Sequence, residues 1–255
     1  MRLSLLVVTV FCVCGLSADV MYETTVTTAT TSELVQGTEV HHRVFIKDDV
    51  ARVERSILHP EHGEITQVMI YRFDRGVVWT LDMDNRQYTE IVLADTVQDI
   101  EKAPGPQPLM DDPEVTVTET GNTKTIVGKT CEEVIISMAE LSDSMKIEVT
   151  VTMWVTQELD SCEELIAFNQ KRGEIDDLLS YPFPAGEGRQ QTTTAKLPIE
   201  MNAVKGFPLQ VSDQMTMTFG DMSMCMKTES VFTKLDDKPI SQLVFEIPYG
   251  FTLQE

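Results

Sequence analysis

Residues 146–156 constrain the fold more than any other part of this chain. Between Lys146 and Thr156 every second side chain is apolar, and the intervening positions are threonine, glutamate or Trp154. Side chains of a strand alternate between faces, so the pattern predicts a long strand with one dry and one wet face. A one-residue slip would expose five apolar groups whose burial contributes about 1.5–3 kcal/mol each, which sets the register. The dry row consists of Ile147, Val149, Val151, Met153 and Val155.

The beginning of the chain has the layout of a secretory signal peptide. Arg2 precedes an apolar run that ends at Cys14, and small residues lead to Ala18. Cleavage after Ser17 and cleavage after Ala18 both remain open. The alternatives are a retained anchor, although the run is short for about 30 Å of hydrocarbon, and lipidation at Cys14, although Val13 stands where a small residue is usual. We expect a signal peptide over 1–18, one domain over 19–255, no integral membrane span and a periplasmic or extracellular location.

The net charge of the chain limits the classes of partner that it can bind. The formal net charge is −21, and the signal segment would remove one positive charge, that of Arg2. So acidic a surface repels phosphate backbones and anionic bilayers, which argues against nucleic acid and against peripheral binding to an anionic membrane. High solubility is the simplest consequence of this charge.

Three cysteines follow the signal segment, which is enough for one disulfide bond. An oxidising compartment favours one bridge among Cys131, Cys162 and Cys225, and three pairings are available. Pairing Cys131 with Cys225 would close a long loop between two strand-like segments, worth about 4–5 kcal/mol in the chain-entropy model. This gives that pair a weak preference as the candidate disulfide.

Alternating apolar residues and turn residues predict strands along most of the chain. No crossover of helical length fits between the first six strands, so we expect an antiparallel meander. A short helical piece over 95–102 and a proline-rich connector over 103–108 follow. The expected strands are 21–30, 38–47, 51–58, 66–73, 77–81, 87–92, 114–119, 124–127, 130–138, 146–156, 206–211, 214–219 and 222–234, and 243–253 closes the chain, broken at Pro248 and Gly250.

A helical insertion is expected near 160–180. Ser161 and Glu164 have the spacing of a capping box, Leu165 follows at helical spacing, and Gly173 is a natural stop before a second short helix. Strands, then helices, then strands predict an α+β fold in which helices cover the dry, concave face of one curved antiparallel sheet.

Several short segments carry a family resemblance across most of the mature chain. The segments are 44–54, 78–82 with Tyr88, 125–131, 153–156 and 245–251. They resemble an uncharacterised family of exported bacterial proteins, which is itself similar to the lipoprotein-carrier (LolA-like) superfamily. The resemblance implies a strongly bent half-barrel sheet with helices in its concavity and an apolar hollow that holds acyl chains in some relatives. It carries no catalytic residues, and the clean lipobox is missing.

Two groups of residues are candidate metal ligands. His59 and His62, with Glu61 and Glu64, could offer ligands to Zn²⁺, but Pro60 prevents a regular helix and no third ligand is identifiable, so a polar loop is the better interpretation. The methionine-rich run 215–226 offers soft thioethers that suit Cu(I), although packing or an apolar cavity explains methionines more simply.

No Gly-x-Ser-x-Gly, phosphate-binding glycine loop or Cys-x-x-Cys pair occurs in the sequence. We therefore expect a non-enzymatic binding or carrier protein, without cofactor, for an apolar ligand such as a lipid or the acyl chain of a lipoprotein. An envelope structural or interaction protein with a self-filled core is the alternative, and copper binding is a lesser one. The candidate cavity residues are Ile147, Val149, Val151, Met153, Val155, Leu165, Met215, Met217 and Phe219.

Overall fold

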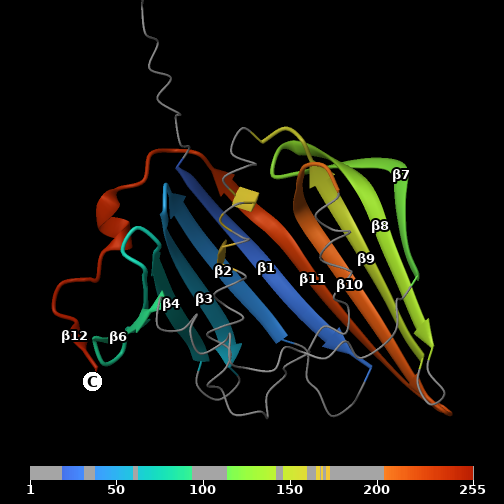
Figure 1. Ribbon diagram of the computed structural model, residues 1–255, viewed down its shortest axis with the longest axis horizontal. Helices are drawn as coiled ribbons and strands as arrows, with labels where there is room; N and C mark the ends of the chain where they lie inside the picture. The colour runs from blue at the N-terminus through green and yellow to red at the C-terminus, as the bar shows by residue number, and fades with distance from the viewer. Residues whose placement is uncertain are drawn as a thin grey trace, which may run out of the picture.

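The computed structural model describes residues 19–31, 38–59, 63–93, 114–141, 146–159, 165–166, 168, 171–172 and 204–254. These residues form one twelve-stranded sheet in the order β12-β6-β5-β4-β3-β2-β1-β11-β10-β9-β8-β7 (Figure 1). Neighbouring strands are antiparallel, apart from β12, which pairs with β6 in parallel. The strands are β1 (Val20–Thr30), β2 (Thr38–Lys47), β3 (Val50–His59), β4 (Gly63–Arg72), β5 (Val77–Asp82), β6 (Gln87–Val92), β7 (Glu114–Ile126), β8 (Lys129–Leu141), β9 (Lys146–Thr156), β10 (Phe207–Phe219), β11 (Met222–Asp236) and β12 (Thr252–Leu253).

The strands β1 to β6 form the antiparallel meander that the local sequence pattern predicted. At its last hairpin the Asp82 carboxylate accepts hydrogen bonds from the backbone N–H groups of Asp84, at 3.1 Å, and Asn85, at 2.9 Å. Such a turn fixes the register of the strands on either side. Strand β9 has the predicted bounds, and its odd-numbered residues are buried while Lys146, Glu148 and Thr150 are exposed, which confirms the predicted alternation.

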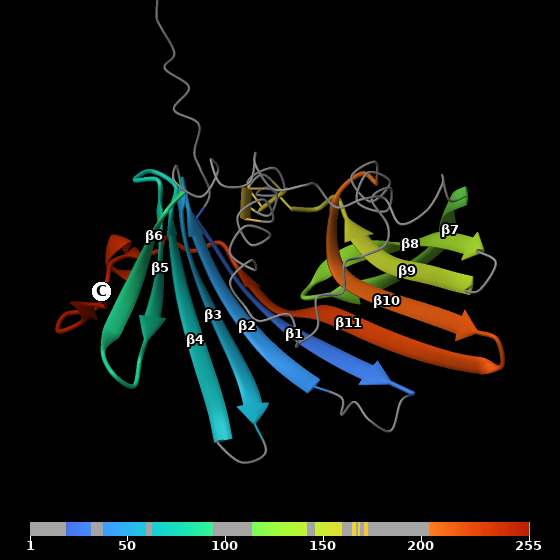
Figure 2. The same cartoon turned by 60° about the horizontal axis from the view of Figure 1, so that its bottom comes forward.

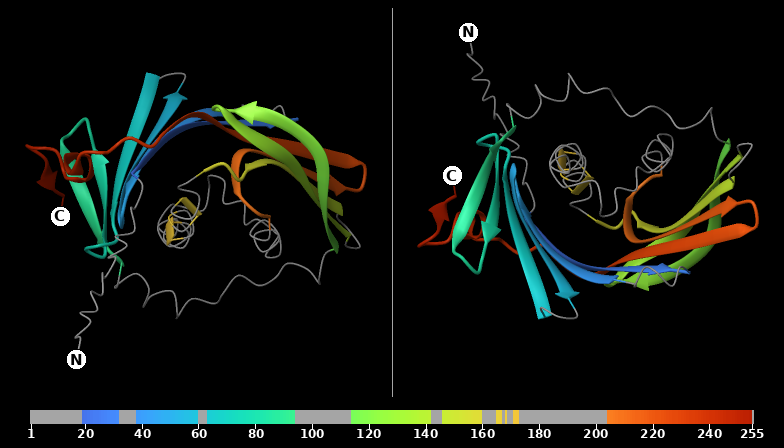
Figure 3. Two further views of the ribbon diagram at one scale, coloured as in Figure 1. Left: turned by 90° about the horizontal axis from the view of Figure 1, so that it is seen from above. Right: turned by 90° about the horizontal axis from the view of Figure 1, so that it is seen from below.

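The sheet is strongly curved, and its two ends bend toward the same side (Figures 2 and 3). The expectation of an α+β fold with helices covering the concave face of a half-barrel is nevertheless wrong. The part of the chain that the structure describes is a large open sheet, and its few helical positions build no covering layer. They are Leu93, Leu165, Ile166, Phe168, Lys171, Arg172 and the 3-10 helix η1 (Gln242–Phe245).

The reason for this error is physical. Alternation and tight turns continue through almost all of the described chain, so its backbone groups bond to neighbouring strands. The helical expectation came from local capping signals at Ser161 and Glu164, which lie outside the described residues, as do the predicted signal peptide, the helical piece 95–102 and the connector 103–108. The closing segment 243–253 also differs from a strand, because it forms η1 and the short β12.

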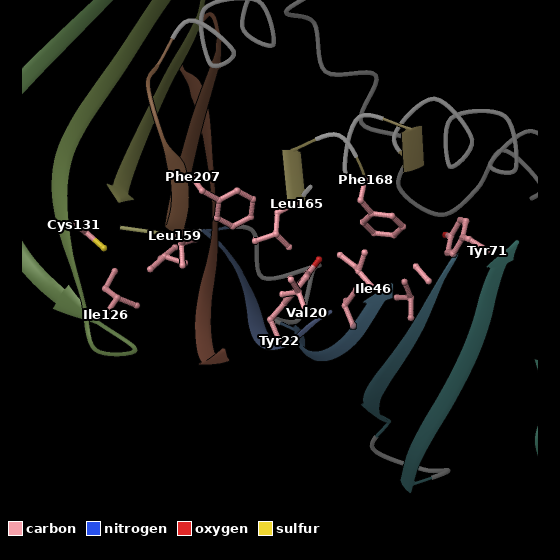
Figure 4. Close-up of a cluster of buried hydrophobic side chains, with 14 of the residues drawn as sticks. Val20, Tyr22, Ile46, Tyr71, Ile126, Cys131, Leu159, Leu165, Phe168 and Phe207 are labelled. Carbon is pink, nitrogen blue, oxygen red and sulfur yellow. The ribbon is translucent and has the colours of Figure 1, made fainter. Parts of the chain in front are cut away.

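Three groups of buried side chains pack on this sheet. The β9 cluster comprises Val134, Ile136, Met138, Ile147, Val149, Val151, Met153 and Val155. The C-terminal cluster comprises Val50, Val68, Ile70, Trp79, Leu81 and Phe245. The central cluster, shown in Figure 4, comprises Val20, Tyr22, Val44, Ile46, Ala51, Val53, Tyr71, Val78, Ile126, Cys131, Leu159, Leu165, Phe168, Phe207 and Leu209.

Strands β2 to β5 bury side chains on both faces over part of their length, whereas residues 63–67 of β4 are exposed. Val44 and Ile46 belong to the central cluster, whereas Phe45 between them packs on the C-terminal cluster. The second face is covered by the C-terminal segment, where the Ser241 side chain caps η1 and Phe245 is fully buried. The segment turns an otherwise exposed sheet face into a second core.

Candidate functional site

A hollow of about 550 Å³ lies over the middle of the sheet, and its lining is mainly apolar. It collects side chains from β1 and β2 near the beginning of the chain and from β9, β10 and β11 in its second half. The lining residues are Tyr22, Thr24, Val26, His42, Met153, Val155, Ile166, Arg172, Val204, Gly206, Phe207, Pro208, Leu209, Gln210, Val211, Ser230 and Phe232, and together they define the hollow.

Strand register builds the floor of the hollow from rows of directly paired residues. In one row Val26 pairs with Ser230, Ser230 with Val211, and Val211 with Met153. Directly paired residues of antiparallel strands point to the same face, so this row continues the dry face of β9 across β10 and β11 to β1. In the next row Thr24 pairs with His42 on one side and with Phe232 on the other.

An aromatic group forms one wall of the hollow. The rings of Tyr22 and Phe232 stack with centroids 4.8 Å apart, and Phe207 meets Phe232 edge-on at 5.6 Å. Burial raises the pKa of Tyr22 to about 12, although the positive charge of Arg172 acts in the opposite direction. The phenol is therefore neutral at physiological pH, and the wall presents an apolar surface with one hydroxyl group.

The entry of the chain into β10 shapes another part of the hollow. Gly206 has φ +103°, and a Cβ atom at this position would lie 2.5 Å from the carbonyl oxygen of Thr156 and 2.9 Å from Val155. Only glycine allows this close approach of the two strands. Two residues later a bulge between Pro208 and Gln210 adds the fully buried Leu209 to the strand, and such a bulge re-aims the side chains around it.

The polar groups of the hollow are few and differ in kind. Among the described lining residues, Arg172 is the only side chain with a permanent charge. Thr24, Ser230 and Gln210 add neutral hydrogen-bonding groups, and His42 adds an imidazole ring. The arrangement suits a molecule with an apolar body and a polar, preferably anionic, end.

The candidate cavity residues fall into three environments. Met153 and Val155 line the hollow. Ile147, Val149 and Val151 belong, like Met153 and Val155, to the β9 cluster but do not line the hollow, and Leu165 is fully buried in the central cluster beside the lining residue Ile166. Outside the hollow, Met215 and Met217 pack half-buried against the β9 cluster, and Phe219 is exposed at the end of β10.

The candidate disulfide between Cys131 and Cys225 is not formed. Both residues carry free thiols, on β8 and β11. Strands β9 and β10 lie between them in the sheet. Three strand spacings amount to roughly 14 Å, about twice the Cα separation that a disulfide tolerates. Cys162 lies outside the described residues.

The sequence interpretation missed the part of the hollow that comes from β1, β2 and β11. Tyr22, Thr24, His42, Ser230 and Phe232 were not among the candidates. Alternation in residues 20–26 indicated a dry face. What no local pattern indicated is that β1 pairs with β11, which is about 200 residues away in the chain.

Within the described ranges, no three or more His, Cys, Asp or Glu side chains form a group that could hold a metal ion. The candidate zinc ligands His59 and His62 have side chains outside the described ones. A search of the same ranges finds no helix with the length and apolar character needed to span a membrane.

Comparisons with known proteins identify no family for this chain. No family model matches the sequence, and no curated protein matches it. Among solved structures, the chain is similar to the crystal structure of a LolA superfamily protein from Nitrosomonas europaea, with 8% sequence identity, 90% of each chain covered and a TM-score of 0.30. At this level of similarity the match supports no inference about function.

Proposed function

We propose that this protein is an exported, non-enzymatic binding or carrier protein for an apolar ligand such as a lipid or the acyl chain of a lipoprotein. The observation that carries the proposal is the hollow, whose volume of about 550 Å³ and mainly apolar lining fit a ligand site. The resemblance of the sequence segments to carriers of acyl chains supports the same conclusion. The signal-like first 18 residues support export.

The lining argues for an amphiphile rather than a hydrocarbon. Val26, Val211 and Met153 offer an apolar floor, and the neutral Tyr22 and Phe232 rings offer an apolar wall. Arg172 contributes positive charge close enough to influence Tyr22. A guanidinium in a low-dielectric setting favours a carboxylate or phosphate, which it can bind through two parallel hydrogen bonds. We therefore expect a fatty acid to bind more tightly than the fatty alcohol of equal chain length.

Native mass spectrometry of gently purified protein, followed by lipid extraction, tests the proposal directly. We expect a co-purified apolar molecule, and displacement of a fluorescent fatty acid by its unlabelled form. A protein that is consistently empty and binds no fluorescent fatty acid would contradict the proposal and favour the envelope interaction protein with a self-filled core.

A pair of variants links binding to the hollow. Val211→Trp places a large ring on the floor, so fatty-acid affinity should fall at least about 10-fold, the effect of losing about 1.4 kcal/mol of binding free energy. Val117→Trp is the matched control, because Val117 is an exposed residue of β7 outside the hollow. Equal affinity in both variants, with both folded by circular dichroism, would place the ligand elsewhere.

A further inference from the structure

Four methionines form a compact group on the hairpin of β10 and β11. Met215 pairs directly with Met226, and Met217 pairs directly with Met224. Met215 also pairs with Val149 and Met217 with Ile147, both buried in the β9 cluster, so all four methionines share the dry face of the sheet. We call Met215, Met217, Met224 and Met226 the methionine quartet. None of its members lines the hollow.

The geometry of the quartet allows its sulfur atoms to converge. Directly opposed residues have Cβ atoms roughly 5 Å apart, and their diagonal neighbours are within reach of long side chains. Methionine has three rotatable side-chain bonds and a polarisable thioether. All four side chains are half-buried, so they are neither locked in the interior nor freely solvated.

An acidic residue stands on the same face beside the quartet. Asp213 lies two residues before Met215 and pairs with Val151 and Thr228. Its Oδ1 atom is buried and has no hydrogen-bond partner. Buried polar groups normally have a partner, and apolar packing by methionines does not explain an acidic residue at this position.

We propose that the methionine quartet and Asp213 form a binding site for a soft monovalent cation of the Cu(I) class. Thioethers are soft ligands that select Cu(I) over hard cations such as Mg²⁺ or Ca²⁺. The adjacent carboxylate supplies the negative charge that neutral thioethers lack. This site is separate from the hollow, and it does not depend on the apolar ligand.

Silver(I), which resembles Cu(I) but does not change oxidation state, is a suitable probe. In protein with ¹³C-labelled methionine methyl groups, we expect silver to shift the four quartet resonances and to leave Met222, which is 74% exposed on the same hairpin, unchanged. The readout distinguishes the quartet from the free thiols of Cys131 and Cys225, which also attract silver. Shifts confined to Met222 or other methionines outside the quartet would overturn the proposal.

Affinity measurements with a competing chelator complete the test, in a background in which Cys131, Cys162 and Cys225 are all replaced by alanine, because free thiols also bind silver. Replacing all four quartet methionines by leucine keeps the volume and should weaken silver binding more than about 100-fold, and Asp213→Asn should weaken it about 10-fold, because outer-shell changes alone cost 10–100-fold in metal sites. Met222→Leu is the matched control and should change nothing. Wild-type protein that takes up no silver, or a folded quartet variant that binds as tightly as wild type, would overturn the site.

Discussion

The two halves of the sheet differ in what covers their two faces. In strands β2 to β5 both faces carry buried side chains, on one face those of the central cluster and on the other those that pack around Phe245 of the C-terminal segment. In strands β8 to β10 the β9 cluster occupies the dry face, while Lys146, Glu148 and Thr150 expose the other face of β9. The first half is a closed double core, and the second is a sheet with one wet face.

The two halves also differ in how their buried charged side chains are paired. In the first half the buried Arg72 binds both oxygens of Asp74, at 2.9 and 2.8 Å, and donates to Glu246 at 2.7 Å, which ties β4 to the C-terminal segment. In the second half Asp213 has a buried oxygen without a hydrogen-bond partner. The pairing of charges in one half indicates a structural role, and the unpaired carboxylate in the other is typical of a site.

The largest expected effect is on the closed half. Phe245→Ala should lower the free energy of unfolding by about 3–5 kcal/mol, because it removes a fully buried ring and leaves a cavity under the C-terminal segment. Denaturant unfolding measures the loss. Leu243→Ala is the control, since Leu243 is 80% exposed in the same 3-10 helix and should change stability by less than about 0.5 kcal/mol. Equal losses would mean that the segment is not anchored by Phe245.

Gly206→Ala tests the entry of the chain into β10 beside the hollow, and it should lower the free energy of unfolding by about 2–4 kcal/mol. The residue would need φ +103°, and its Cβ would clash with the backbone oxygen of Thr156. Strain and overpacking each contribute about 1–3 kcal/mol at such a position. Gly76→Ala is a useful comparison, because Gly76 has φ +66° with open space around the added atom, so it reports strain alone. Equal thermal shifts in both variants would contradict the close approach.

Arg72→Met should lower stability at pH 7 by about 2 kcal/mol, the usual cost of losing charge-assisted hydrogen bonds. The Arg72 guanidinium holds the pKa of Asp74 below its usual range. A lowered folded-state pKa stabilises the protein above the unfolded value, about 3.9, and this stabilisation is lost as pH falls through the folded value. The difference between wild type and variant should therefore shrink on acidification below about pH 4. A difference that is constant with pH would exclude the ion pair as its source.

Asp213→Asn should have the smallest effect and the opposite sign, a gain of about 1 kcal/mol at pH 7, because it removes a buried unpaired charge. Burial raises the folded-state pKa of Asp213, so its contribution favours the folded state at low pH and is lost as pH rises through the raised value. The gain should vanish below the unfolded value, about pH 3.9. Denaturant unfolding at several pH values without added metal measures this, and a variant less stable than wild type at pH 7 would contradict it.

Strands were the most predictable part of this protein. The bounds expected for β2, β6 and β9 match those of the structure, because their side-chain period and turn residues are local properties. Two pairs of expected segments merged into the longer strands β7 and β10, since a bulge or a polar residue on one face does not end a strand. The α+β class was wrong, because a local capping signal says nothing about whether a helix forms a layer.

The candidate site was predictable only in part. Met153 and Val155 were among the candidates because the alternation of β9 marks its dry face. Ile147 and Val151, on the same face, pack within the core, and no pattern in the sequence distinguishes a core position from a cavity position. Tyr22 and Phe232 were missed because their contact depends on a pairing between the first and last long strands.

By itself the sequence determined that residues 146–156 form a strand with one dry face and that a meander of strands precedes it, since both follow from side-chain period and turn chemistry. Only the tertiary structure decided what covers each face. Burial depends on which strands become neighbours, so the pairing of the distant strands β1 and β11 created the hollow, and the hairpin of β10 and β11 placed Met224 and Met226 beside Met217 and Met215. Period assigns a side chain to a face, and topology decides whether that face is packed, hollow or wet.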